Sequence, residues 1–456
     1  MENAASLVAD QRAFFLNGNT MDYEFRKRQL QKLRNMLKDN EPKIYRALKK
    51  DLNKSKHEVM TTELGIIYSE IDVALRNLKY WMAPEKVPSP LTHKGSKSFI
   101  LKEPYGVTLI ISPWNYPLQL ALVPAIGAIA AGNCVILKPS EHARATSSLL
   151  HQMVKTYFDA PYFYVVEGDE QACQALLQEK LDYIFFTGSK ETGKLIMREA
   201  SNHLTPVTLE LGGKSPAIVD EDANIPLAAK RLVWGKFTNA GQSCAAPDYV
   251  YVHETVKFRL LKFLIKHIKS LFGKEPLKNK DYTRIINEKH FNRLTRYLEE
   301  GKVIHGGKTD AESLMIEPTL LEKVSWEDSV MQEEIFGPIL PILPFVNIED
   351  ALFKIKQQEK PLALYYFGED DKTQQQVMEY ISFGGGSVND SMYHLANPHL
   401  PFGGVGSSGM GAYHGRYSFN TFSHQKGILK QTTKFDLPFR YPGSKLTDSI
   451  LDKFLN

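Results

Sequence analysis

The sequence contains very little cysteine: Cys134, Cys173 and Cys244 are the only three in 456 residues, and they lie far apart. No CxxC pair is present, so the spacing supports neither a disulfide framework nor a zinc site. We therefore expect a reducing, cytoplasmic location and predict no metal ion.

An excess of one charge is also absent. The formal net charge is only +4, and the lysines and arginines are spread along the chain. This distribution gives no reason to expect nucleic acid as a partner. With 43% hydrophobic and 24% charged residues, the composition is that of a folded globular protein.

Long uninterrupted hydrophobic runs are missing as well. Residues 116–137 carry no charge, and a segment of that length could span a membrane. However, Pro124, Gly127 and the pair Gly132-Asn133 interrupt it. The glycine and asparagine pair predicts a turn between a buried helix and a short strand.

The two ends of the chain carry no membrane signal either. Glu2, Asp10 and Arg12 precede any apolar run, which is the wrong order for a secretory signal. The tail, residues 438–456, is polar. We expect no stable membrane anchor.

What the sequence does contain is an alternation of helical and strand patterns. Its length predicts two or three domains. Residues 25–81 are expected to be helical because apolar residues recur at steps of three and four. Short strands are predicted at residues 107–111, 135–137, 163–166 and 183–186, with helical segments between them. This order indicates parallel βαβ units, and a second set begins after Gly212-Gly213.

A basic amphipathic segment at residues 256–272 has two interpretations. One predicted helical face carries Phe258, Leu261, Ile265, Ile268 and Phe272, with lysines elsewhere. Such a helix could bind a membrane surface. A solvated lysine face on a helix that packs against the core is the favoured interpretation.

Residues 237–245, FTNAGQSCA, point to a reactive cysteine. A thiol attacks a carbonyl only as its thiolate, so it needs access and surroundings that stabilise negative charge. Small and polar residues precede Cys244 and provide such a loop. Cys134, in an apolar strand, and Cys173, in a helical run, fit buried structural cysteines instead.

Glu210 interrupts an apolar strand just before Gly212-Gly213. An unpaired carboxylate buried there would have its pKa raised toward that of a general base, and it could activate water. A solvent-facing glutamate on an edge strand is the alternative.

Two turns follow predicted strands, at the sheet edge where α/β proteins bind ligands. Asn115, in SPWNYP, carries an amide that can donate to an oxyanion, although proline and asparagine are also ordinary turn residues. In GSKETGK, residues 188–194, backbone amides at a helix start can receive a phosphate. The same segment matches a phosphate-binding loop until Leu195, which cannot supply the Mg²⁺-binding hydroxyl.

These segments, in this order, resemble the aldehyde dehydrogenase superfamily. The agreement continues with LKPSE at residues 137–141, EEIFGP at 333–338 and LPFGG at 400–404, and it covers nearly the whole chain. The short N-terminus, the CAAPDYV that begins at Cys244 and the GMGAYHG at 409–415 look most like the class 3 branch. That branch includes fatty and aromatic aldehyde dehydrogenases.

The resemblance implies an α/β fold with a Rossmann-like cofactor domain, an α/β catalytic domain and a small bridging β element that supports a homodimer. The cofactor domain is then expected at residues 1–83 and 102–211, and the catalytic domain at 212–395. The bridging elements would be residues 84–101 and 396–437, followed by the tail.

The resemblance also implies the chemistry. Cys244 would attack the aldehyde, with Asn115 and the Cys244 backbone N–H as the oxyanion hole. Collapse of the tetrahedral oxyanion would expel hydride to the nicotinamide and leave an acyl thioester. Glu210 would activate the water that hydrolyses it, and such a glutamate argues against a CoA-acylating relative.

Cofactor contacts are implied near the adenosine ribose, at the pyrophosphate turn and near the nicotinamide. A carboxylate at Glu141 can accept both ribose hydroxyls and repels a 2′-phosphate, so NAD is expected over NADP, with NADP still possible. The implied residues are Trp114, Lys138, Glu141, Thr187, Gly188, Ser189, Gly193, Leu211, Gly212, Glu334 and Phe336.

The aldehyde pocket is predicted only as a hypothesis, at Tyr68, Tyr116, Ser243 and Phe402, and core packing is the alternative for the aromatic residues. The substrate is expected to be a medium- or long-chain aliphatic aldehyde or an aromatic one. Three other function classes stay open: a phosphate-loop NTPase, against which Leu195 argues, a cofactor-independent thiol esterase that uses Cys244, and a non-catalytic structural or binding protein that binds NAD without reducing it.

Overall fold

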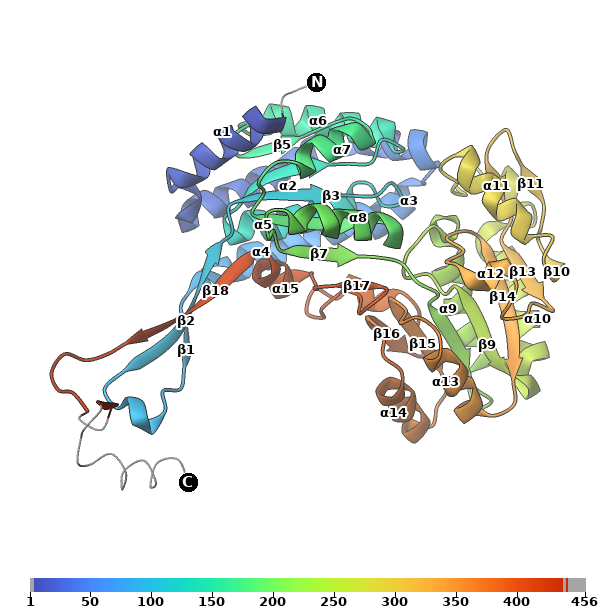
Figure 1. Cartoon of the computed structure of the whole chain (residues 1–456). Coiled ribbons are helices and arrows are strands. Elements are labelled where there is room, and N and C mark those ends of the chain that lie inside the picture. The colour runs from blue at the N-terminus through green and yellow to red at the C-terminus, as the bar shows by residue number, and fades with distance from the viewer. Residues whose placement is uncertain (1–3, 438–439, 442–456) are drawn as a thin grey trace.

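The computed structural model describes residues 4–437, 440 and 441, and it contains two large open β-sheets and a smaller one (Figure 1). The predicted α/β class is confirmed. The predicted polar tail lies almost entirely outside the described residues.

The first sheet has six strands, of which only β17 is antiparallel to its neighbour. In order, it comprises β17 (Gly409–Met410), β7 (Val207–Glu210), β6 (Tyr183–Thr187), β3 (Val107–Ile111), β4 (Cys134–Lys138) and β5 (Phe163–Val165). The four strands predicted from the alternation are confirmed to within a residue at each end. The chain runs outward from β3 through β4 to β5 and then returns to the other side of β3 at β6. Ligands bind at such a reversal, outside the carboxyl ends of the strands.

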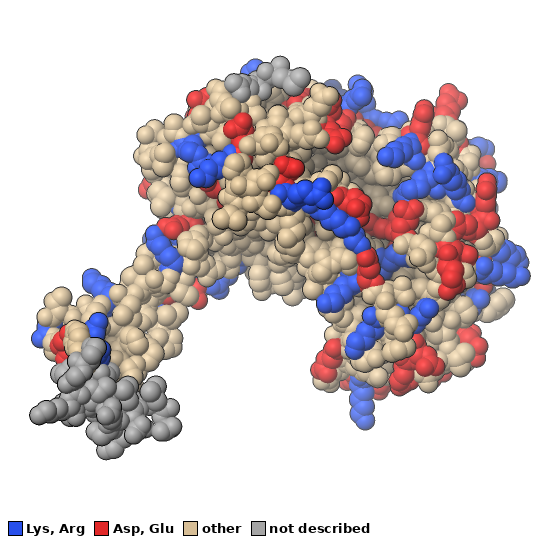
Figure 2. Space-filling model, viewed as in Figure 1, with Lys and Arg blue, Asp and Glu red and all other residues tan. Residues whose placement is uncertain are grey.

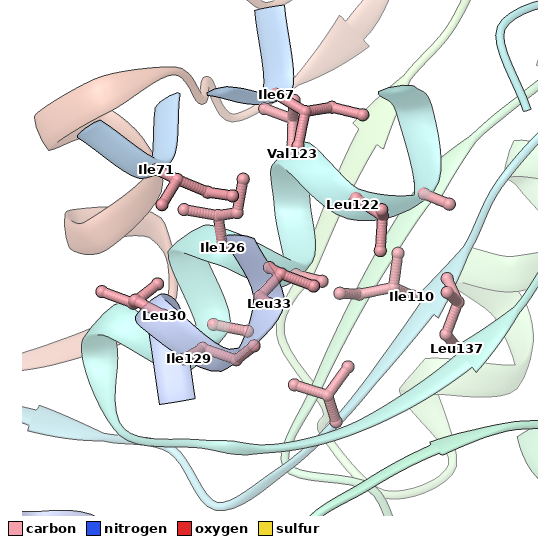
Figure 3. Close-up of a cluster of buried hydrophobic side chains, with 14 of the residues drawn as sticks. Leu30, Leu33, Ile67, Ile71, Ile110, Leu122, Val123, Ile126, Ile129 and Leu137 are labelled. Atoms are coloured by element: carbon pink, nitrogen blue, oxygen red, sulfur yellow. The ribbon is translucent and has the colours of Figure 1, made fainter. Parts of the chain in front are cut away.

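Helices cover both faces of this sheet, so β3, β4 and β6 are buried along their whole length. One face packs against α2 (Tyr23–Leu52), α4 (Gly65–Met82), α5 (Gln119–Ala131), α6 (Arg144–Tyr157) and α15 (Gly415–Thr421). The other packs against α1 (Ala4–Leu16), α7 (Glu170–Leu177) and α8 (Lys190–Ser201). Along β3, Ile110 joins the first core while Leu109 and Ile111 join the second. Figure 3 shows α2 and α4 side chains around Val123 and Ile126 of α5.

The uncharged stretch at residues 116–137 forms the buried helix and turn predicted from it. Every residue of α5 is buried, and Gly132 ends the helix at a φ of 96°, with its N–H bonded to Ala128 O at 3.1 Å. Within the described part of the chain, no helix is both long and apolar enough to cross a membrane.

The helical region predicted at residues 25–81 is interrupted. Asn53 ends α2 in the left-handed conformation, with a φ of 62°. The short α3 (Lys56–Val59) and a π-helical turn (Met60–Leu64) then lead into α4.

The second sheet has seven strands, with β10 antiparallel to its neighbour and the others parallel. In order, it comprises β10 (Lys302–His305), β13 (Thr319–Glu322), β14 (Ile339–Phe345), β9 (Tyr249–His253), β8 (Pro216–Val219), β15 (Ala363–Phe367) and β16 (Gly385–Val388). Its helices are α9 (Ile225–Phe237), α10 (Glu254–Phe272), α11 (Glu288–Tyr297), α12 (Ser329–Gln332), α13 (Ile348–Lys356) and α14 (Asp371–Tyr380). A separate hairpin pairs β11 (Thr309–Asp310) with β12 (Met315–Ile316).

The amphipathic helix predicted at residues 256–272 is α10, and it packs on α9. The predicted apolar face is wrong at one position, because Phe258 is 82% exposed. Leu260, Leu264 and Ile268 form the buried stripe instead. These positions are four residues apart, whereas Phe258 is displaced by about 200° from Leu260 around the helix.

The third sheet projects from the body as an arm built from β1 (Glu85–Val87), β2 (Lys97–Pro104) and β18 (Ser423–Lys430) (Figure 1). Its strands come largely from the two segments predicted as bridging elements, although β2 continues past residue 101 into the predicted cofactor domain. The second segment is divided, however, because β17 and α15 belong with the first sheet. The predicted domain division near Leu211 falls between β7 and β8, and it stays a prediction. Charges of both signs are interspersed on the face shown in Figure 2.

Candidate active site

The carboxyl ends of neighbouring strands in the first sheet carry several of the predicted site residues. Lys138 ends β4, Thr187 ends β6 and Glu210 ends β7, while the turn after β3 carries Trp114 and Asn115. Because these strands are parallel, their carboxyl ends meet at one edge of the sheet. Thr187 and Glu210 are direct register partners.

The cysteine loop is set by an unusual backbone after α9. Asn239, Ala240 and Gly241 all have left-handed φ values of 55°, 51° and 72°. A side chain at Gly241 would place its Cβ 2.2 Å from the carbonyl oxygen of Gly337, so only glycine fits there. The Gln242 side chain then bridges Asn239 O and Arg284 O, each at 3.0 Å, which anchors the loop before Cys244.

The turn that carries Asn115 is tied to this loop. Asn115 Nδ2 donates to Gln242 O at 3.1 Å, and Asn239 Nδ2 donates to Asn115 O at 2.9 Å. Asn115 is 2% exposed. An amide nitrogen carries two hydrogens, so Asn115 keeps a donor for a second acceptor near Cys244.

The three cysteines differ in burial. Cys134 is buried in β4 as predicted, but the prediction of a buried Cys173 is wrong, because Cys173 is only partly buried, as is Cys244. Burial, followed by the carboxylates of Glu334 and Glu210, raises the pKa of the Cys244 thiol. A proton must therefore leave this thiol before it can attack a carbonyl.

Glu210 lies in an interior position, so the solvent-facing alternative is wrong. Glu210 is 3% exposed, and its strand β7 is not at the sheet edge, because β17 pairs with β7 on the side away from β6. Burial raises the pKa of Glu210 well above its ordinary value. Neither of its carboxylate oxygens has a hydrogen-bond partner among the described residues. A protein rarely leaves both oxygens of a buried carboxylate unpaired unless a ligand or water completes the site.

The start of α8 fits a phosphate group. Ser189 caps the helix by accepting from Thr192 N, and Gly188 immediately precedes it. A Cβ at Gly193 would lie 2.7 Å from Leu211 Cδ2, so glycine allows α8 to pack closely at this point. Free amides at the helix N-terminus suit a pyrophosphate.

A second group of residues fits the nicotinamide half of a dinucleotide. Glu334 Oε1 is buried and unpaired among the described residues, and burial raises the pKa of Glu334 to about 8. A Cβ at Gly212 would come within 1.9 Å of Glu334 Oε2. Phe336 meets Trp114 edge to face, with ring centroids 5.3 Å apart. The unpaired carboxylate and its glycine neighbour leave a place for ribose hydroxyls.

Lys138 and Glu141 lie together as the resemblance implied. Lys138 is buried, and its Nζ is 3.5 Å from Glu141 Oε2. The Glu141 side chain is 42% exposed, which leaves its carboxylate open to a ligand.

The predicted pocket residues separate into two groups. Tyr116 interacts with both Ser243 and Cys244, and burial raises its pKa. Phe402 pairs with Tyr413, whose hydroxyl interacts with Glu210 and Cys244. Tyr68 lies between α2 and α4 and donates to Glu41 Oε1 at 2.7 Å. Its place in the pocket stays a prediction.

The sequence interpretation missed several residues that support the site. Asp248 accepts from Ile335 N at 3.0 Å and pairs with Lys214, which fixes the segment that carries Glu334. His290 packs against Trp114 with ring centroids 5.1 Å apart. Asp248 lies within the CAAPDYV segment without being singled out there, and His290 belongs to no quoted motif. Only the fold brings each of them to the site.

Comparison with known proteins identifies relatives over almost the full chain. The family described as "Aldehyde dehydrogenase family" matches residues 2–428. The chain is 48% identical to the 4,4'-diaponeurosporen-aldehyde dehydrogenase of Staphylococcus aureus, over 96% of this chain and 95% of that protein. It is 45% identical to aldehyde dehydrogenase family 3 member B1 of Rattus norvegicus, over 97% and 95%.

Solved structures agree with these matches. A structure titled as the substrate-bound state of Staphylococcus aureus AldH superimposes with a TM-score of 0.98, at 46% identity and full coverage of both chains. An NAD⁺ complex of an aldehyde dehydrogenase from Bacillus cereus superimposes with a TM-score of 0.85, at 27% identity, over 94% of this chain and 89% of that one.

Proposed function

The chain belongs to the aldehyde dehydrogenase family and resembles its family 3 members, so it is an oxidoreductase that acts on aldehydes; on this premise we propose that Cys244 is its nucleophile, Glu210 its general base and Asn115 its oxyanion donor. The observation that carries the proposal is the pairing of a partly exposed thiol with a buried, unpartnered carboxylate. Glu210 lies near enough to Cys244 to add, after burial and Glu334, to the raised pKa of the thiol, and both of its own oxygens lack a partner among the described residues.

The first step is attack by Cys244 Sγ on the aldehyde carbon, which produces a tetrahedral oxyanion. Asn115 Nδ2 and the Cys244 backbone N–H donate to that oxyanion. Burial raises the pKa of Glu210, so its carboxylate is a stronger base than a carboxylate in water.

The second step is hydrolysis of the acyl thioester on Cys244. Glu210 takes a proton from water, the water oxygen attacks the acyl carbon, and the thiol leaves with the carboxylic acid as product. The unpartnered oxygens of Glu210 support this role, because a water molecule would satisfy them.

For the cofactor we propose NAD. Gly188, Ser189 and Gly193 would hold its pyrophosphate, Glu334 would bind the nicotinamide ribose, and Phe336 would border the ring. When bound, the nicotinamide would accept the hydride that is lost as the oxyanion collapses, and this oxidation leaves the acyl thioester on Cys244 that the second step hydrolyses. The exposed carboxylate of Glu141 supports a preference for NAD over NADP, because it would repel a 2′-phosphate.

The proposed substrates are medium- or long-chain aliphatic aldehydes or aromatic ones, and the aldehyde named for the Staphylococcus aureus relative belongs in the panel. We propose Tyr116, Ser243 and Phe402 as pocket residues. We also propose a cytoplasmic homodimer assembled through the arm.

The decisive test mixes the purified protein with NAD and an aldehyde panel and follows absorbance of the reduced nicotinamide. Cys244→Ala should abolish reduction, whereas Cys173→Ala should retain it. Ester hydrolysis without any aldehyde-dependent reduction would favour the thiol esterase instead.

A further inference from the structure

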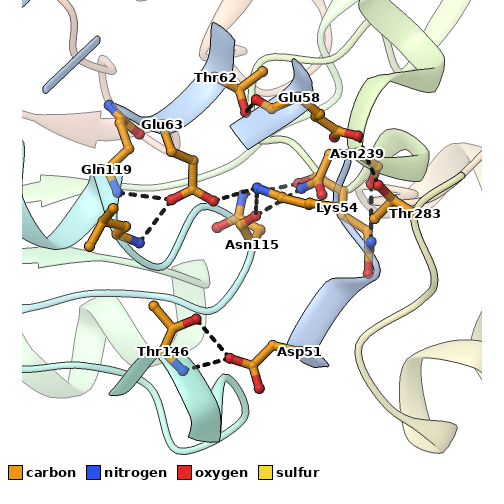
Figure 4. A network of polar contacts seen from close by, with 12 residues as sticks. Asp51, Lys54, Glu58, Thr62, Glu63, Asn115, Gln119, Thr146, Asn239 and Thr283 are labelled. Carbon is orange, nitrogen blue, oxygen red and sulfur yellow. Dashed lines mark hydrogen bonds and ion pairs between the residues drawn. The ribbon is translucent and has the colours of Figure 1, made fainter. Parts of the chain in front are cut away.

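A buried lysine lies directly behind the turn that carries Asn115. Lys54 is 1% exposed, and its Nζ donates to Glu63 Oε1 at 2.7 Å and to Asn115 O at 3.0 Å (Figure 4). The ammonium also lies 4.1 Å from the ring centroid of Tyr116. Protein groups therefore surround this cation, and it is not free to contact a substrate.

Glu63 extends this hold to the other end of the same turn. It is fully buried in the π-helical turn before α4, and its second oxygen accepts from Leu118 N at 2.9 Å and Gln119 N at 3.0 Å. These amides open α5, whose N-cap residue provides no side-chain bond of its own. The Lys54–Glu63 pair thus fixes both the Asn115 carbonyl and the start of the helix that follows.

The pair also connects the turn to the cysteine loop. Asn239 Nδ2 donates to the same Asn115 carbonyl at 2.9 Å and to Gln242 O at 3.0 Å. Gln242 O in turn accepts from Asn115 Nδ2. Two donors on one carbonyl fix the peptide plane, and a fixed peptide plane sets the direction in which the Asn115 side chain leaves the backbone.

The free-energy cost of burying the Lys54–Glu63 ion pair indicates that the pair positions the Asn115 turn. A buried ion pair often contributes little net stability, because desolvation offsets the attraction between the charges. Its geometric effect is larger, since catalytic donors lose much of their effect when displaced by about 1 Å.

We propose that Lys54, held by Glu63, is a positioning residue that keeps the Asn115 amide aimed at the oxyanion through the main-chain carbonyl of Asn115. The inference rests on the proposed role of Asn115. Lys54, in the N-terminal helical region, would thus support catalysis without contacting substrate or cofactor.

The test is a double-mutant cycle on kcat. Lys54→Met should lower kcat by roughly 10- to 100-fold and leave KM for the aldehyde nearly unchanged. Asn115→Ala should lower kcat as well, and Lys54→Met combined with Asn115→Ala should be no slower than Asn115→Ala alone. Such non-additivity is expected when one residue acts only through the other.

A second variant keeps the test valid if Lys54→Met alone fails to fold. Lys54→Met leaves the buried Glu63 carboxylate without a cation to balance its charge. The cycle is therefore repeated with Lys54→Met and Glu63→Gln together, which removes both charges. Arg26→Met is the matched control, because Arg26 is also a buried cation that binds main-chain carbonyls, at Thr20 and Ala130, away from Asn115. It should lower thermal stability and retain the wild-type kcat.

The outcomes separate the two ideas. Wild-type kcat in Asn115→Ala would overturn the oxyanion role and the inference with it. Two results would overturn the positioning role alone, provided that Asn115→Ala is slow. One is wild-type kcat in the variant that carries both Lys54→Met and Glu63→Gln. The other is a kcat loss for this variant that adds to the loss caused by Asn115→Ala.

Discussion

At the residue scale, the site depends on what surrounds a few ionisable groups. Cys244 and Glu210 each have a raised pKa, and in both cases burial is the main cause. Burial disfavours the charged form of an acid, so both groups hold their protons at higher pH than they would in water. The ionised form of such a carboxyl group is a stronger base than a carboxylate in water.

Glu210→Gln should separate the two chemical steps. We expect kcat to fall by about 10²- to 10⁴-fold, because the general base for thioester hydrolysis is lost. Rapid mixing should still show a burst of reduced nicotinamide. Wild-type kcat should rise with pH as Glu210 loses its proton, at a midpoint above its ordinary pKa of 4.5, and the variant should lack this rise.

Glu349→Gln is the matched control, since Glu349 is exposed on α13, on the second sheet's side of the molecule. It should retain both kcat and the pH profile. A Glu210→Gln enzyme with wild-type turnover would remove Glu210 from the mechanism.

At the scale of elements, close approaches between segments shape the cofactor site. Gly212, after β7, lies so near Glu334 that any side chain must displace the carboxylate. Gly212→Ala should therefore raise KM for NAD by roughly tenfold or more, with a smaller effect on folding. Initial rates against NAD concentration measure this. Gly427→Ala, where an added Cβ meets nothing within 4 Å, should leave KM for NAD unchanged.

The packing of α4 against α15 predicts a pH-dependent stability. Glu70 Oε2 accepts from Gly415 N at 2.8 Å, and burial raises the pKa of Glu70 from 4.5 to about 7. A raised carboxyl pKa means that the folded state binds more protons than the unfolded state between these values. Its contribution to stability is present below pH 4.5 and is lost as pH rises through 7.

Glu70→Gln keeps an acceptor for Gly415 N and removes the titration. From pH 4.5 to pH 8, the free energy of unfolding of the wild type should fall by about 3 kcal/mol relative to this variant. Urea unfolding at both pH values measures the difference. Parallel pH dependences in the two proteins would contradict the assignment.

At the scale of the whole molecule, the arm leaves an edge strand uncovered in the described chain. β18 pairs with β2 on one side only, and Leu429 on it is 51% exposed. An exposed edge with apolar residues is a pairing surface for a second chain. Leu429→Asp should shift the proposed dimer toward monomer in sedimentation velocity. Phe258→Asp, at an 82% exposed position on α10, should leave the dimer intact.

Local elements and candidate catalytic residues could be predicted from the sequence alone. The strands at residues 107–111 and 183–186, the buried helix that ends at Gly132 and the family resemblance all follow from residues close together in the chain. Apolar periodicity and glycine turns are properties of short segments, so they can be recognised without the fold. The error at Phe258 arose because several residues of a long helix can share an approximate apolar face, and only packing selects the buried stripe.

The contacts between these residues, in contrast, arise only in the folded chain. Lys54 and Asn115 are separated by 61 residues, and Asn115 and Gln242 by 127, yet hydrogen bonds join them. The pKa of Glu210 is likewise raised by burial in the folded chain, where Gly409 of β17, far along the sequence, is its register partner. Burial and long-range contacts are set by which segments meet in the folded chain, and no pattern of neighbouring residues specifies that meeting.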